Sequence, residues 1–112
     1  MAEENAPAPR PATLTGAQTR GLRAQAHHLK AIVWVGQNGM TEAVKRAIRA
    51  ALGDHELIKV SLGGASSKER KALAAIIAEQ TGSHVVQTIG KVGAFYRRKK
   101  TDPVVPLLGV KT

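Results

Sequence analysis

The segment Gly36-Gln37-Asn38-Gly39, the 36–39 loop, is the pattern in this sequence that most directly predicts chemistry. Two glycines separated by two residues let the backbone turn sharply and approach a ligand closely, because no Cβ atom stands in the way. The loop leads into a predicted helix, where free N–H groups and the helix dipole favour a bound phosphate. A Gly-x-x-Gly loop before a basic helix is one way in which RNA-binding modules hold a nucleotide backbone. We therefore interpret the loop as a phosphate contact, with a plain strand-to-helix turn as the alternative.

Basic side chains follow this loop in the sequence. Lys45, Arg46 and Arg49 lie on the helix that the loop introduces, away from its apolar face. Arg20 and Arg23 are three residues apart and share one face of an earlier predicted helix. All of these cations can contact phosphates, although ordinary surface solvation explains Arg20 and Arg23 nearly as well.

The last predicted strand supplies a second group of candidates. Strand alternation puts Phe95 and Tyr96 on opposite faces, so we expect only one of them in the core and Tyr96 to be exposed. The basic run 97–100 follows Tyr96 and is predicted to contact RNA, and Lys91 lies in a hairpin turn from which it can reach a phosphate. The complete set of candidate RNA contacts is Gly36, Gln37, Asn38, Gly39, Lys45, Arg46, Arg49, Arg20, Arg23, Lys30, Lys91, Tyr96, Arg97 and Arg98.

The patterns of metal and catalytic sites are missing from the sequence. It contains no cysteine, which excludes disulfides and thiolate ligands. No two of its histidines have the spacing of a metal-ligand pair, and the 36–39 loop lacks the Gly-Lys-Ser/Thr that completes a nucleotide-binding P-loop. Asp54 and Glu56 are interpreted as capping and solubility residues. We predict no catalytic residue, metal, cofactor or small-molecule substrate, and thus not an enzyme. The histidines are His27, His28, His55 and His84.

The charge balance favours a polyanionic partner. The chain has 112 residues with 17 Lys+Arg against 8 Asp+Glu, a formal net charge of +9. Such an excess attracts nucleic acid, with an anionic membrane surface as the competing partner. No apolar stretch approaches the ~20 residues that span a bilayer, and the first residues do not resemble a secretory signal. We therefore expect a cytoplasmic protein that binds no membrane.

Periodicity predicts one compact α/β domain with the order α-β-α-β-α-β-β, a four-stranded mixed sheet packed with three helices. The two helical crossovers predict parallel neighbouring strands, and the closing hairpin predicts an antiparallel pair. A disordered Ala/Pro-rich leader at 1–13 and an irregular tail at 101–112 flank the domain at 14–100. The expected helices are at 16–27, 42–54 and 67–81, and the expected strands at 31–35, 57–62, 84–89 and 92–97.

Two further expectations concern large apolar side chains. Trp34 lies in an otherwise aliphatic strand, which favours a core position over a base-stacking role. Leu73, Ile76 and Ile77 are expected to form the buried stripe of the third helix.

Several blocks of the sequence, taken together, resemble the YhbY-like family, which shares the CRM (chloroplast RNA splicing and ribosome maturation) domain. They are LKAIVWVGQNGMTE at 29–42, HELIKV at 55–60, VQTIGK at 86–91 and FYR at 95–97. The resemblance implies a fold similar to the C-terminal domain of bacterial translation initiation factor three and RNA binding through the 36–39 loop. It also implies a ribosome assembly factor acting on precursors of the large subunit. Gly93 departs from the family's usual larger apolar residue and is expected to loosen the last strand locally.

Two other functions remain open on the sequence alone. One is a kink-turn RNA-binding protein of the ribosome itself, since such proteins are also small and basic. The other is a small enzyme or regulator that uses the 36–39 loop to hold a phosphorylated metabolite, which the lack of paired acid–base groups disfavours.

Overall fold

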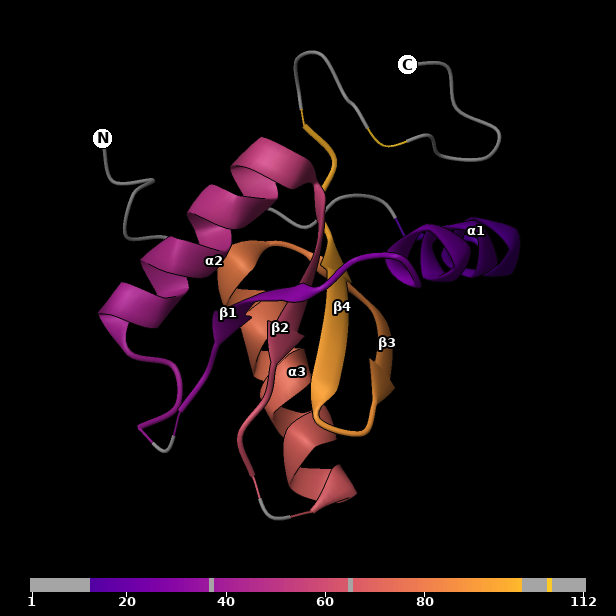
Figure 1. The fold of residues 1–112 in the computed structure, drawn as a ribbon. Helices are drawn as coiled ribbons and strands as arrows, with labels where there is room; N and C mark the ends of the chain where they lie inside the picture. The colour runs from indigo at the N-terminus through magenta and orange to yellow at the C-terminus, as the bar shows by residue number, and fades with distance from the viewer. Residues whose placement is uncertain (1–12, 37, 65, 100–104, 106–112) are drawn as a thin grey trace.

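The computed structural model describes residues 13–36, 38–64, 66–99 and 105. Within these residues the predicted order of elements is confirmed (Figure 1), and the bounds differ from the predicted ones by no more than one residue. The predicted leader and tail lie outside the described residues apart from Thr13 and Val105, as does Gln37 of the candidate contacts. The elements are α1 (Gly16–Ala26), β1 (Ala31–Trp34), α2 (Glu42–His55), β2 (Leu57–Ser61), α3 (Ser67–Thr81), β3 (His84–Ile89) and β4 (Val92–Tyr96).

The sheet has four strands in the order β1-β2-β4-β3. β1 and β2 are parallel neighbours as predicted, and β4 is antiparallel to both β2 and β3. The prediction that the second crossover also joins parallel neighbours is wrong, because β4 lies between β2 and β3. The residues of β4 explain its central place: Ala94, Phe95 and Tyr96 are all buried, whereas β3 is mostly half-exposed and occupies an edge.

Side chains at the helix ends fix where each helix begins and stops. The Thr15 hydroxyl accepts from Gln18 N at 3.0 Å, and Gln18 Oε1 accepts from Thr15 N at 2.9 Å, which completes a capping box. The hydroxyls of Thr41 and Ser66 cap α2 and α3 by accepting from Val44 N and Glu69 N. Gly82 ends α3 in the left-handed conformation, with φ +67°, as the sequence predicts.

Helices cover both faces of the sheet, so there are two apolar clusters. α2 and α3 pack on one face, and α1 packs on one end of the other (Figure 1). Phe95 belongs to the first cluster and Tyr96, 1% exposed, to the second. The prediction that Tyr96 is exposed is therefore wrong: alternation assigns the two rings to opposite faces correctly, but α1 turns the second face into core as well.

Two apolar side chains lie where the sequence did not place them. Trp34 is 66% exposed rather than buried, because its side of the sheet is covered by α1 only at the far end, near Leu57. Ile76 is 45% exposed, whereas Ile77 is buried as predicted and Leu73 is partly buried against the first cluster. The other buried residues of α3 are Ala74, Ala78 and Thr81.

Gly93 makes room for an aromatic ring. A Cβ atom at this position would lie 2.9 Å from Cε2 of Phe95 and 3.2 Å from Cδ1 of Leu62. The strand is paired on both sides here, with Val60 and with Thr88. The expected local loosening of β4 is therefore not observed, since the ring of Phe95 fills the space that a larger residue would need.

Candidate nucleic-acid interface

The 36–39 loop continues directly from β1. Val35 N still donates to Ser61 O at 2.9 Å, and Gly39 N then donates to Gly36 O at 3.1 Å, closing a turn. Gly39 has φ +68°, a conformation that L side chains avoid, so the glycine is needed for the turn itself. At Gly36 a Cβ would meet nothing within 4 Å. The backbone at Gly36 is therefore open on its outer side, as contact with a ligand requires.

The loop delivers the chain to the N-terminus of α2 with cations close behind. Thr41 accepts from Val44 N at 3.2 Å, which fixes where the helix starts. Lys45 and Arg49 are four residues apart, and Arg46 precedes Arg49 by three, so the three side chains lie on adjoining parts of one helix surface. Arg46 is exposed, and Lys45 and Arg49 are half-buried.

A second glycine turn lies beside the 36–39 loop. A Cβ at Gly63 would be 3.0 Å from Val35 O and 3.3 Å from Gly36 O, so the segment after β2 passes directly against the start of the loop. This segment leads into α3, capped by Ser66, just as the 36–39 loop leads into α2. Because β1 and β2 are parallel, both helices begin at the same end of the sheet.

The β3–β4 turn reaches this same end, which we call the loop end. Leu62 N donates to Lys91 O at 2.7 Å, and Arg70 donates from Nε to Gly90 O at 2.7 Å and from Nη1 to Gly64 O at 3.2 Å. Arg70 thus joins two of the turns, and Lys91 is exposed beside them. The sequence analysis missed Gly63, Gly64 and Arg70, although a Gly-Gly pair between a strand and a helix repeats the signal of the 36–39 loop.

The structure separates the remaining candidate contacts from the loop end. Lys30 precedes β1, and Arg97 and Arg98 follow β4, which runs antiparallel to β2, so all three lie at the opposite end. Five residues of β4 separate the two ends by roughly 17 Å. Arg20 and Arg23 lie on α1, across the sheet from α2 (Figure 1). The predicted contacts therefore do not form one continuous surface.

Arg97 serves the fold rather than an open surface. Its Nη1 donates to Thr81 O and its Nη2 to Arg49 O, both at 3.1 Å, so one guanidinium joins the C-terminal part of α2 to the end of α3. Burial, and then the charge of Arg49, lowers the pKa of Arg97. Because its donors are used within the fold, Arg97 is not part of an exposed interface. Tyr96 is not part of one either, because it is buried.

Glu56 is buried, which corrects its interpretation as a solubility residue. It follows α2 with φ +62°, and its carboxylate accepts from Lys99 N and Val105 N, both at 2.6 Å. Its own carbonyl accepts from Arg97 N at 2.8 Å. Glu56 therefore holds the backbone of Lys99 and Val105 against the domain, and Val105 packs against the cluster under α1.

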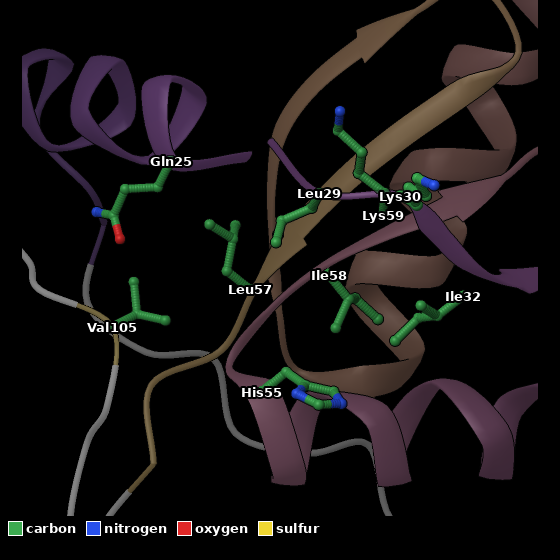
Figure 2. A pocket seen from close by; sticks show the side chains of 9 residues that line it. All are labelled: Gln25, Leu29, Lys30, Ile32, His55, Leu57, Ile58, Lys59 and Val105. Atoms are coloured by element: carbon green, nitrogen blue, oxygen red, sulfur yellow. The ribbon is translucent and has the colours of Figure 1, made fainter. Parts of the chain in front are cut away.

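A cavity of about 320 Å³ lies at the end opposite the 36–39 loop (Figure 2). Leu29 and Leu57 both line it, and Gln25 extends from α1 toward Val105. Gly36, Asn38 and Gly39, the described residues of the 36–39 loop, do not line this cavity. Among the described residues no three His, Cys, Asp or Glu side chains come together as a metal site, and no helix is long and apolar enough to cross a membrane.

Comparison with known proteins identifies the family whose sequence pattern this chain matches. The model of the CRS1/YhbY (CRM) domain matches residues 14–97. A probable RNA-binding protein of Pseudomonas aeruginosa is 42% identical over 85 residues, covering 76% of this chain and 82% of that protein. A probable RNA-binding protein of Bacillus subtilis, YqeI, is 36% identical over 94 residues, covering 84% and 98%.

A solved structure has the same fold. The solution structure of a hypothetical protein from Staphylococcus aureus, described as a candidate RNA-binding protein, matches with a TM-score of 0.77 and 36% sequence identity. The match covers 85% of this chain and 99% of that one. The fold that the sequence predicts is thus also that of a solved relative.

Proposed function

Since the chain belongs to the CRS1/YhbY (CRM) domain family, we propose that it is an RNA-binding protein whose partner is ribosomal RNA of the large-subunit precursor. In this proposal it acts in the cytoplasm as a ribosome assembly factor, and it is neither an enzyme nor a holder of a cofactor. Its relatives are named as RNA-binding proteins, which supports RNA as the partner. The choice of the large-subunit precursor as the specific RNA rests on the family resemblance of the sequence.

The observation that carries the proposal is the arrangement of the loop end. Two helices begin there behind glycine turns, and each N-terminal dipole favours an anionic group. Lys91 and the α2 cations Lys45 and Arg46 lie next to these turns and add charge without base specificity. An RNA backbone provides successive phosphates for such a surface, whereas a small metabolite would use only one of the two helix starts.

Sedimentation of cell extracts tests the role in assembly. We expect the protein to travel with large-subunit precursors at low salt and to be absent from mature subunits washed at high salt, because an assembly factor leaves the finished particle. Protein that stays on mature subunits at high salt would indicate a structural ribosomal protein instead. Crosslinking followed by sequencing of the bound RNA identifies the segment, and recovery of no RNA at all would contradict RNA binding itself.

A further inference from the structure

The face of the sheet opposite α2 and α3 is only partly covered. The strand register sorts its paired residues into three rows across the sheet, because paired residues point to the same side. The covered row, under α1, is Leu57, Tyr96 and His84. The middle row is Ala31, Lys59, Ala94 and Gln87. The outer row is Trp34, Ser61, Val92 and Ile89.

The outer row leaves two large apolar side chains in solvent. Trp34 is 66% exposed and Ile89 is 65% exposed, at the two ends of the outer row. A hollow of about 420 Å³ lies on the same face, lined by the middle row, by Val92 and Ile89 of the outer row, and by His27 and Leu29 just after α1. Exposed large apolar groups on a sheet face that is only partly covered mark this face as a candidate interaction site.

We propose that Trp34 is a stacking platform for an unpaired RNA base and that the open sheet face takes single-stranded RNA. This rests on the proposed RNA binding and adds the class of RNA and a second contact surface. An indole face stacks on any base, and the Lys59 ammonium, which lies in the middle row, supplies charge to the backbone that carries the base. Ser61 and Gln87 offer hydrogen bonds to base edges.

Proximity to the loop end connects the two surfaces. Trp34 precedes Gly36 by two residues, and two extended residues span about 7 Å. A strand whose phosphate contacts the 36–39 loop can therefore place an adjacent base over the indole. Paired bases cannot do this, because both of their faces are already stacked within a helix.

The chemistry of the face favours RNA over a protein partner. None of the residues that the register places in the three rows is acidic, and Lys59 lies in the middle of the open part. Lysine is depleted from the centres of protein–protein interfaces, whereas it is common where a backbone phosphate is bound.

The intrinsic fluorescence of the full-length protein tests the proposal directly, because Trp34 is the only tryptophan. The probes are an oligouridylate on the order of 10 nucleotides long and an RNA duplex of matched length. We expect the oligouridylate to quench the Trp34 emission at the concentrations at which anisotropy reports binding. Binding of the oligouridylate without any change in emission would overturn the platform while leaving RNA binding intact. A parent protein that binds neither probe would instead overturn the proposed function.

Variants of Trp34 measure what the stacking contributes. Trp34→Ala is expected to weaken oligouridylate binding about 10-fold, Trp34→Phe to recover most of this loss, and the duplex to be affected much less. Ile76→Ala is the matched control, since it removes an exposed apolar side chain from the opposite side of the sheet. Equal affinity of parent and Trp34→Ala for the oligouridylate would also overturn the proposal and leave a protein partner as the occupant of this face. Because Trp34 is exposed, thermal unfolding of both Trp34 variants should match the parent.

Discussion

At the scale of single residues, Glu56 attaches Lys99 and Val105 to the domain. Its carboxylate satisfies the backbone N–H groups of Lys99 and Val105, and removing it would leave both without their acceptor. We expect Glu56→Ala to lower the free energy of unfolding by about 2–4 kcal/mol, since bonds to a charged group contribute ~1.5–3 kcal/mol each and are not additive. Glu56→Gln keeps an acceptor and should cost less. Urea titration measures both, and equal losses for the two variants would show that the hydrogen bonds are not the cause.

The burial of Tyr96 predicts how the stability of the protein changes at alkaline pH. Burial, and then the nearby Glu56 carboxylate, raises the pKa of Tyr96 above its ordinary value of 10.0, with Arg98 acting in the opposite direction. The folded state thus favours the neutral phenol, so this contribution to stability is complete below pH 10 and is lost as the pH rises through the folded-state pKa.

Phenylalanine at position 96 isolates this effect. The Tyr96 hydroxyl is buried and has no hydrogen-bond partner among the described residues, so Tyr96→Phe should change stability at pH 7 by less than about 1 kcal/mol. Between pH 9 and pH 11, on either side of the ordinary tyrosine pKa of ~10, the parent should lose stability faster than Tyr96→Phe. Parallel stability curves over this range would show that Tyr96 does not titrate differently on folding.

The three aromatic residues show where reasoning from the sequence stops at this scale. Alternation correctly placed Phe95 and Tyr96 on opposite faces, but it does not say which faces are covered. Trp34 was expected in the core on composition alone, yet it is exposed because α1 reaches only one end of its face. Whether a strand residue is buried depends on the docking of a distant helix, and no local pattern contains that information.

At the scale of elements, we expect substitutions in the 36–39 loop to change RNA binding with little effect on stability. Gln37→Asp with Asn38→Asp adds two negative charges where the proposed phosphate binds, and acids near a helix N-terminus are mildly stabilising. We expect thermal unfolding to shift by only a few degrees while RNA affinity falls about 10-fold or more, roughly 1.4 kcal/mol. The neutral control is Gln37→Ala with Asn38→Ala. If the acidic variant is folded and binds RNA as the parent does, the loop is only a turn.

Removing the negative charge of Glu42 should have the opposite effect on RNA binding. Its carboxylate lies in the first turn of α2, where it interacts favourably with the helix dipole but repels a phosphate. Glu42→Gln should therefore cost about 0.3–1 kcal/mol of stability and strengthen RNA binding by about 2- to 5-fold. Glu79→Gln, at an exposed position late in α3, removes the same charge away from the α2 start and serves as control. Weaker or unchanged binding by Glu42→Gln would argue against a phosphate at this helix start.

The bounds of the elements were predictable because their signals are local. Thr15, Thr41 and Ser66 cap their helices as short-range hydrogen bonding dictates, and Gly82 ends α3. The place of β4 between β2 and β3 was not predictable from the crossover rule, which fixes handedness and direction but not adjacency. Central placement follows from burial on both faces, a property of the assembled sheet.

At the scale of the whole molecule, the distribution of charge decides which surface binds RNA. The formal net charge of +9 attracts a polyanion to any part of the protein, so charge alone cannot identify an interface. Reasoning from the sequence identified the cations but could not locate them in space. The fold divides them between the loop end, α1 and the opposite end of the sheet. Two sets of variants with equal change in charge can therefore separate the general field from a specific surface.

The first set removes three cations near the loop end by substitution with glutamine: Lys45, Arg46 and Lys91. The second set removes three cations elsewhere in the same way: Arg20, Lys30 and Arg98. Both lower the net charge equally, so a purely general field predicts equal losses of affinity. If the loop end is the interface, the first set should weaken RNA binding by about 10-fold or more and the second by no more than a few-fold.

Salt dependence provides an independent measure of the same difference. Each phosphate contact with single-stranded RNA adds about 0.7 to the slope of log affinity against log salt concentration, so loss of three contacts should reduce the slope by about 2. The first set should show this reduction, and the second set should keep nearly the parent slope, because cations that do not touch phosphates release few counterions. Anisotropy titrations between roughly 50 and 200 mM salt cover the range in which such slopes are resolved. A reduced slope in the second set alone would move the interface to α1 and the opposite end of the sheet, and two equal reductions would mean that RNA wraps around both ends.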